Sequence, residues 1–128
     1  MGDRLKIFFD GGCRGTAGVM ETAVVVRGVA HVRTDHGSGT SAEAEWLALV
    51  EAATLAAAST EPDIVFVGDS VVVINQARGI AACRGETLQR HRATFVTLTA
   101  SIPRFGFRHV GRAQNLAGNA LERLHGRR

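Results

Sequence analysis

The chain has 128 residues, of which 45% are hydrophobic and 21% are charged. This length suits a single domain over residues 1–128, and the composition excludes a disordered or fibrous protein. The net charge of +3 comes almost entirely from arginine, since Lys6 is the only lysine. A mildly basic balance is compatible with binding to a phosphate backbone, but many small domains carry a charge of this size.

Long apolar segments and metal-binding cysteine patterns are both missing from the sequence. The longest apolar stretch, residues 52–58, is far shorter than the roughly 20 residues that a membrane span needs. With no apolar signal region near the first residue, we expect a cytoplasmic protein without membrane contact. In that setting a disulfide between Cys13 and Cys83 is not expected, and no spacing typical of a zinc site occurs.

The first third of the chain predicts three antiparallel strands. Residues 5–9 form a compact apolar run that ends at Asp10, and residues 11–18 are rich in glycine and predict an irregular loop. Residues 19–27 and 29–34 predict a hairpin with Gly28 at its turn.

A long helix should begin after Gly39. Thr40 can act as its N-cap, and Glu43 lies three residues further on, which is the pattern of a capping box. Apolar side chains then recur at helical spacing and should face the sheet: Trp46, Leu49, Val50, Ala53 and Ala57.

The remainder of the chain predicts alternating strands and helices. Residues 63–67 predict a buried strand, which is followed by a short helix to about Ala77, stopped by Gly79. Residues 86–102 predict a helix halted by Pro103, residues 104–110 a half-exposed strand, and residues 116–124 a last helix before a frayed tail. The order βββ-α-β-α-α-β-α indicates an α/β fold with a five-stranded mixed sheet, three antiparallel strands followed by two parallel ones, flanked by helices.

Three acidic residues occupy informative positions. Asp10 and Asp69 end two predicted strands, and Glu45 lies in the second turn of the first long helix. The carboxyl ends of strands in an open α/β sheet are where ligands gather, and hard cations such as Mg²⁺ prefer carboxylate oxygens. The alternative is that the aspartates are turn residues and that Glu45 is a solvated helix residue.

The flanking sequence resembles the type 1 ribonuclease H family, in particular its shorter archaeal-like and bacterial members. The resemblance runs from Ile7 to Leu124 and rests on four motifs in the expected order and at fitting separations. They are the stretches at residues 7–15 (IFFDGGCRG), 40–46 (TSAEAEW), 67–76 (VGDS through INQ) and 109–115 (HVGRAQN).

This resemblance implies a ribonuclease H-like fold and an endoribonuclease that hydrolyses the RNA strand of RNA–DNA hybrids. Two Mg²⁺ ions, with Mn²⁺ as an alternative, would assist in-line attack by water and leave 5′-phosphate and 3′-hydroxyl ends. Asp10 would bridge both ions, Glu45 and Asp69 would hold the second, and Asn119 occupies the fourth ligand position.

Substrate contacts are also implied by the resemblance. Glu45 and the backbone from Gly11 through Gly12 to Cys13 would lie against ribose 2′-hydroxyls, with Arg14 beside them as a further substrate-binding residue. Thr40 would bind a phosphate of the DNA strand, and Arg112 a substrate phosphate. His109 would assist product release or proton transfer, the alternative being a histidine packed on the sheet.

Several positions depart from the family pattern. The fourth acid is an aspartate in the family and Asn119 here, which supplies an oxygen without charge, so we expect a weaker first metal site. Glu122, one helical turn on, is the nearest acid that could compensate. Thr16 and Ala42 replace asparagines that commonly touch substrate, and residues 79–85 leave no room for the basic protrusion of longer members.

Two alternatives therefore stand beside the hybrid-specific nuclease. Asn119 favours a catalytically weak ribonuclease H-like domain that binds nucleic acid or a protein partner, whereas retention of three clustered carboxylates argues against a pure binder. Another nuclease on the same fold, acting on DNA or structured RNA, is the third reading. No obligate protein partner is evident from the sequence.

Overall fold

The computed structural model describes residues 4–126, and these build one five-stranded sheet in the order β3-β2-β1-β4-β5. Strands β2 and β3 pair antiparallel with their neighbours, whereas β4 and β5 run parallel to β1. The predicted mixed sheet is therefore confirmed. The strands are β1 (Leu5–Arg14), β2 (Val19–Val26), β3 (Val29–Arg33), β4 (Asp63–Gly68) and β5 (Arg104–His109).

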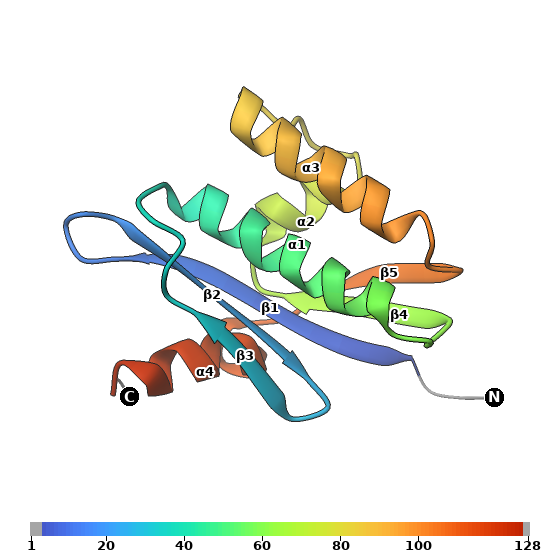
Figure 1. Ribbon diagram of the computed structural model, residues 1–128, viewed down its shortest axis with the longest axis horizontal. Helices are drawn as coiled ribbons and strands as arrows, with labels where there is room; N and C mark the ends of the chain where they lie inside the picture. Colours follow the sequence, from blue (N-terminus) through green and yellow to red (C-terminus); the bar gives the residue numbers. More distant parts are fainter. Residues whose placement is uncertain (1–3, 127–128) are drawn as a thin grey trace.

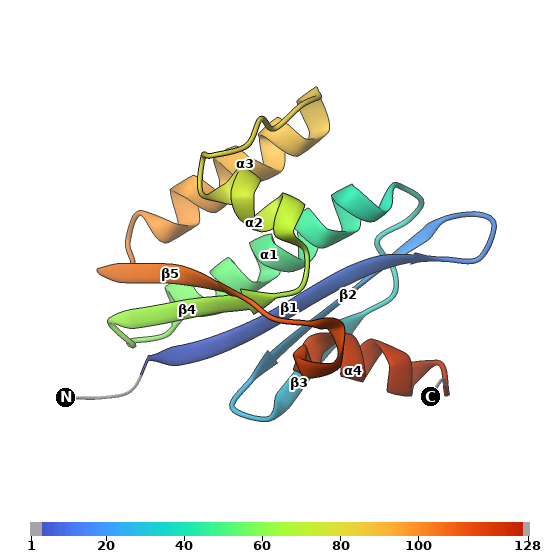
Figure 2. The same cartoon turned by 180° about the vertical axis from the view of Figure 1, so that it is seen from behind.

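Helices cover both faces of the sheet (Figures 1 and 2). The long helix α1 packs along β1 and β2, with α2 and α3 on the same side, and α4 lies on the opposite face against β1 and β2. The helices are α1 (Ser41–Ala58), α2 (Val71–Ala77), α3 (Glu86–Thr99) and α4 (Leu116–Leu124), with a short 3-10 turn, η1 (Arg112–Gln114), before α4.

The glycine-rich segment differs from the prediction. Strand β1 continues through Gly11 and Gly12 to Arg14, so the irregular loop is confined to residues 15–18. The prediction of irregular structure over the whole segment was wrong because β2 pairs with β1 along its full length, up to the Arg14–Val19 pair, and these backbone hydrogen bonds outweigh the weak strand propensity of glycine.

Strand β1 has two neighbours at its beginning and one at its end. Strand β4 pairs with it only from Leu5 to Phe8, while β2 pairs with it as far as Arg14. From about Asp10 onward, one backbone edge of β1 is therefore left without a strand partner, and this edge begins where the acidic residues lie.

The end of one helix and one side-chain contact at the start of another differ from the prediction. Helix α3 ends at Thr99 rather than at Ile102, whose N–H instead bonds the Thr99 carbonyl in a turn before Pro103. At the start of α1, Thr40 Oγ1 accepts the Glu43 N–H at 3.1 Å, as predicted, but the Glu43 carboxylate turns to His91 Nε2 at 3.2 Å. The cap is thus formed by Thr40, and Glu43 links α1 to α3.

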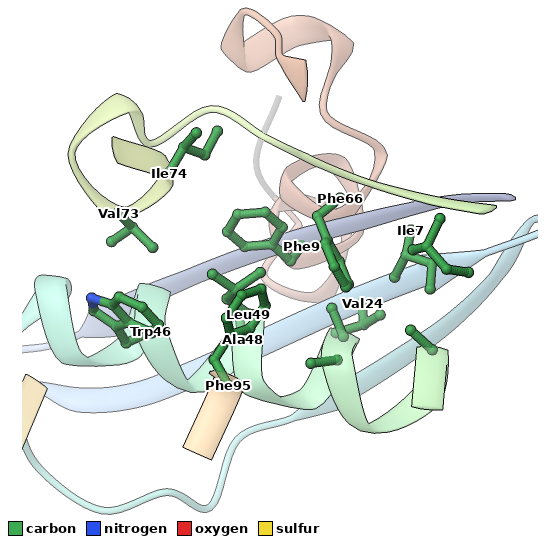
Figure 3. Close-up of a cluster of buried hydrophobic side chains, with 14 of the residues drawn as sticks. Ile7, Phe9, Val24, Trp46, Ala48, Leu49, Phe66, Val73, Ile74 and Phe95 are labelled. Atoms are coloured by element: carbon green, nitrogen blue, oxygen red, sulfur yellow. The ribbon is translucent and has the colours of Figure 1, made fainter. Parts of the chain in front are cut away.

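The main core lies between the sheet and the α1–α3 layer (Figure 3). Trp46, Phe9, Phe66 and Phe95 are fully buried there, and the ring centroids of Phe66 and Phe95 are 5.6 Å apart. Trp46, Leu49 and Ala53 face this core as predicted, while Val50 and Ala57 are half-buried. Trp46 Nε1 donates to Gln76 Oε1 at 2.8 Å, which ties α1 to α2 and anchors the turn that carries Glu45.

Neither cysteine is in a disulfide: Cys13 is exposed and Cys83 is half-buried, and both are free. Over residues 4–126, no helix combines the length and the apolar character that crossing a bilayer requires.

Candidate active site

Asp10, Glu45 and Asp69 converge at one edge of the sheet. Asp10 lies on β1 and Asp69 follows β4 directly, and because these two strands are parallel neighbours, their carboxyl ends meet. Helix α1 brings Glu45 to the same point, and one carboxylate oxygen from each residue lies within 4.8 Å of the other two. The clustering expected from the sequence is therefore present.

Gly11 allows Glu45 to come this close. A Cβ at Gly11 would fall on the carbonyl group of Ala44, so only glycine lets α1 pack directly against β1 here. In return, the Gly11 N–H donates to Glu45 Oε1 at 3.2 Å. The backbone of Gly11 thus orients Glu45, and it belongs to the part of β1 that has no strand partner on one side.

Burial and mutual repulsion perturb the acids. Burial raises the pKa of Glu45 to about 9, and the charges of Asp10 and Asp69 act in the same direction. Burial also raises the pKa of Asp10, which is only 1% exposed, although Arg112 opposes the shift. The three acids therefore resist being ionised together, and a bound cation would favour their ionised forms.

Arg112 places a guanidinium group directly between two of the acids. Its Nη1 donates to Asp10 Oδ1 at 2.8 Å and to Asp69 Oδ2 at 3.0 Å. Its Nε lies 3.9 Å from Glu122 Oε2, so Glu122 meets the site through Arg112. The contact expected between Arg112 and a substrate phosphate stays a prediction, and the structure adds that this side chain is an internal counter-charge of the cluster.

Asn115 is a site residue for which the sequence analysis assigned no role. It is fully buried, and its Nδ2 donates to the Phe9 carbonyl at 3.0 Å and to Asp69 Oδ2 at 3.2 Å, while Oδ1 caps α4 by accepting the Ala117 N–H. One amide therefore links β1, Asp69 and the start of α4. An asparagine just before a helix is a recognisable N-cap signal, but its partners 46 and 106 residues away could not be read locally.

Asn119 lies at the end of the first turn of α4. It is half-buried, and its Nδ2 makes a long hydrogen bond of 3.4 Å to the Ala113 carbonyl. This contact uses the amide nitrogen and leaves the amide oxygen as the atom able to face a cation. Its role as fourth ligand stays a prediction.

The other candidate residues surround this edge. His109 ends β5 beside Gly68, the residue before Asp69, and it is exposed rather than packed on the sheet. Thr40 is exposed at the start of α1, and Cys13 Sγ donates to the Gly39 carbonyl at 3.2 Å. Arg14 lies at the end of β1, on the exposed surface.

A pocket of about 330 Å³ runs from Asp10 and Arg112 along the glycines of β1 to its far end. It is lined by Asp10, Gly11, Gly12, Cys13, Arg14, Gly15, Glu21, Arg112, Leu121 and His125. A larger, more open depression of about 940 Å³ lies over the beginning of β1, where Arg4, Lys6 and Phe8 contribute to its lining. Asp10 of the acidic cluster and Arg112, which bonds two of its acids, line the smaller pocket, which is therefore the candidate site.

Comparison with known proteins gives a consistent result. The model of the family described as reverse transcriptase-like matches residues 8–124. The structure of ribonuclease H1 from the halophilic archaeon Halobacterium salinarum superposes with a TM-score of 0.84 at 30% sequence identity, covering 96% of this chain and 98% of that one. No curated protein sequence matches this chain.

Two further solved structures share the fold at lower identity. The N-terminal ribonuclease H domain of a Mycobacterium tuberculosis protein has a TM-score of 0.81 at 21% identity, with 97% of both chains covered. The ribonuclease H1 called LC11, solved in complex with an RNA/DNA hybrid, has a TM-score of 0.77 at 24% identity and covers 91% of this chain and 92% of its own. Given the family match over residues 8–124 and the 30% identity to the Halobacterium enzyme over nearly all of both chains, the protein belongs to the type 1 ribonuclease H family.

Proposed function

We propose that the protein is a metal-dependent endoribonuclease that hydrolyses the RNA strand of RNA–DNA hybrids and leaves 5′-phosphate and 3′-hydroxyl ends. The observation that carries this proposal is the convergence of Asp10, Glu45 and Asp69, with oxygens within 4.8 Å of one another, in a chain of the ribonuclease H family.

The residues present fit divalent cations. Three carboxylates share one small volume, and burial together with mutual repulsion raises the pKa of Glu45 to about 9. Because such a cluster is costly without compensating charge, a hard cation with oxygen ligands suits it. Asp10, Glu45 and Asp69 would hold two Mg²⁺ ions, or Mn²⁺ in their place, and the Asn119 oxygen would complete one site.

Bound there, the metal ions supply positive charge to the attacking water and to the leaving oxygen of the phosphodiester. The protein's part is to hold the carboxylates in place. Asn115 fixes Asp69 through its amide nitrogen, and the Gly11 N–H fixes Glu45. Arg112, already bonded to Asp10 and Asp69, is placed to turn its guanidinium toward a substrate phosphate when cations take over those oxygens.

The proposed choice of RNA rests on the edge of β1. The backbone from Gly11 to Cys13 borders the pocket and is paired with β2 on only one side. Backbone groups beside the acids can meet ribose 2′-hydroxyls, which DNA lacks. A hybrid-bound structure of LC11 ribonuclease H1, which shares the fold, supports this substrate class.

Asn119 supports a second candidate, a ribonuclease H-like domain with weak catalysis that binds nucleic acid or a protein partner. The amide nitrogen of Asn119 bonds the Ala113 carbonyl, and this position brings no negative charge to the cluster. The two candidates differ in turnover and agree on the binding surface, so cleavage assays separate them.

The test is incubation of the purified protein with end-labelled RNA–DNA hybrid, single-stranded RNA and duplex DNA, in Mg²⁺ and separately in Mn²⁺. We expect cleavage of the RNA in the hybrid alone, and loss of that cleavage in Asp10→Asn. Asp35→Asn, an exposed acid outside the cluster, is the matched control and should keep full activity. Hybrid binding without cleavage would favour the second candidate, and undiminished cleavage by Asp10→Asn would assign the activity to other residues or to a contaminant.

A further inference from the structure

A second polar cluster closes the far end of the pocket that begins at Asp10. His125 Nε2 lies 2.7 Å from Glu21 Oε1, and Arg14 Nε lies 2.6 Å from His125 Nδ1 and 2.9 Å from its Nε2. All three side chains line the same pocket as Asp10 and Arg112. The sequence analysis placed His125 in a frayed tail, which was wrong for this residue; Arg127 and Arg128 lie outside the described residues.

Glu21 is the unusual member of this cluster, because it carries a carboxyl group and is only 7% exposed. It lies directly across from Gly12 in the β1–β2 register, and this glycine brings no side chain against it. Arg14 Nε is 4.0 Å from Glu21 Oε2, which is a weak direct pair, whereas the contact through His125 is short. Glu21 therefore acts on Arg14 mainly by way of the histidine.

His125 contacts both Arg14 and Glu21 through its ring nitrogens. A guanidinium N–H can only donate, so a ring nitrogen of His125 must accept from Arg14. The same ring contacts Glu21 Oε1 through its Nε2, so His125 links the arginine to the carboxyl group. This arrangement holds Arg14 through Nε and leaves its terminal nitrogens to a ligand, since half of the Arg14 side chain is exposed.

We propose that Glu21 and His125 are positioning residues that hold the Arg14 guanidinium against a backbone phosphate of the RNA strand lying along the glycine edge of β1. Arg14 is four residues beyond Asp10 on the same strand, which is about 13 Å at strand spacing and amounts to a few nucleotides from the scissile bond. The inference rests on the proposed function, because it requires a nucleic-acid strand in this pocket. Guanidinium is the group best suited to hold a phosphate in a fixed orientation.

The experiment measures binding of a fluorescent RNA–DNA hybrid by anisotropy at several salt concentrations, with every protein carrying Asp10→Asn to prevent cleavage. Arg14→Ala should weaken binding about fivefold to tenfold and lower the slope of log affinity against log salt by about one, because one phosphate contact is lost. His125→Ala should have a similar but smaller effect. The control is Arg104→Ala, which replaces an exposed arginine at the first residue of β5, at the other end of this strand from His109. It should leave the slope unchanged.

A double substitution separates positioning from a merely structural role. If His125 acts through Arg14, then His125→Ala should weaken binding no further in a protein that already carries Arg14→Ala. His125→Gln should restore much of the affinity, since its amide oxygen can accept from Arg14 while its amide nitrogen donates to Glu21. Thermal unfolding of each variant shows which proteins remain folded at the assay temperature, and His125→Gln keeps the test decisive where His125→Ala does not fold.

The outcomes distinguish this inference from the proposed function. If the Asp10→Asn parent does not bind the hybrid, the proposed function fails and the positioning role fails with it. If the parent binds with a strong salt dependence, but Arg14→Ala and His125→Ala leave it unchanged, only the positioning role is overturned. Additive losses in the double variant, or no rescue by His125→Gln, would also overturn it.

Discussion

Two glutamates of α1 lie in contrasting surroundings. Glu51 accepts the Thr22 hydroxyl at 2.7 Å, and His36 Nε2 and Arg33 Nη1 lie 2.9 and 3.8 Å from its other oxygen. Glu45, six residues earlier, accepts the Gly11 N–H and faces Asp10 and Asp69. The same residue type is therefore satisfied by donors in one place and surrounded by like charge in the other.

The neighbouring groups distinguish a structural carboxylate from one that can bind a cation. Around Glu51, a hydroxyl, an imidazole and a guanidinium tie β2, β3 and the following loop to α1. Around Glu45, repulsion and burial raise the pKa, and the nearby guanidinium of Arg112 is bonded to the other two acids. Charge that the fold leaves uncompensated marks the site where we expect a ligand to supply it.

Replacing each glutamate by glutamine tests whether the two carboxylates have different roles. Glu45→Gln should reduce hybrid cleavage at least about a hundredfold, because about 3 kcal/mol of transition-state charge stabilisation would be lost with the metal site. Without metal it should unfold at a higher temperature than the parent, since like-charge repulsion is relieved.

Glu51→Gln should show the reverse pattern. It should keep its activity but lose about 1 kcal/mol of unfolding free energy, as hydrogen bonds to a charged acceptor become weaker. Steady-state cleavage rates and thermal unfolding in a chelator provide both measurements. Equal effects of the two substitutions on activity would show that the contrast has no functional meaning.

Arg112→Ala removes the guanidinium that bonds both Asp10 and Asp69. We expect Mg²⁺ to bind about tenfold more tightly, since a competing cation worth about 1.4 kcal/mol is gone, while the metal-free protein becomes less stable. Calorimetric titration with Mg²⁺ measures the first effect and thermal unfolding the second. Arg123→Ala, an exposed position on α4, is the control, and metal affinity that is the same in all three proteins would refute competition at these oxygens.

Restoring an acid at the fourth ligand position tests Asn119 directly. Asn119→Asp adds a negative charge beside the cluster, so the Mg²⁺ concentration for half-maximal cleavage should fall severalfold and metal-free stability should drop. Asn119→Ala should impair activity more than Asn119→Asp does. Superimposable Mg²⁺ titrations for the parent and both variants would mean that Asn119 does not ligate metal.

A pH dependence of stability is also expected from Glu45. Its folded-state pKa of about 9 lies above the value of 4.5 for an unperturbed glutamate, so the native state binds the extra proton between these two values. Stability from this group is complete below pH 4.5 and is lost as pH rises toward 9. In chelator, the unfolding temperature of the parent should fall relative to that of Glu45→Gln as the pH rises from 5 to 9, and Mg²⁺ should close that gap. A constant difference across pH would contradict the raised pKa.

Much of the fold and part of the site followed from local patterns. Alternating and helical periodicities located all five strands and the four helices, and the ends of two strands located Asp10 and Asp69. The run through Gly11 and Gly12 was misjudged because strand pairing with β2, rather than local propensity, determines its conformation. Arg112, which was predicted to contact a substrate phosphate, donates hydrogen bonds to Asp10 and Asp69.

Three features could be predicted from the sequence alone. They are the order of elements, the helix cap at Thr40, and the convergence of three carboxylates from two parallel strands and α1. These follow from interactions between residues close in the chain, and from the rule that parallel strands end on the same side of a sheet. Which side chains contact these carboxyl groups became clear only from the tertiary structure. The contacts of Asp10 with Arg112, of Asn115 with Phe9, and of Glu21 with His125 join residues more than a hundred positions apart. Such pairs depend on how α4 packs beneath the sheet, and no local pattern records the direction in which a long side chain will point.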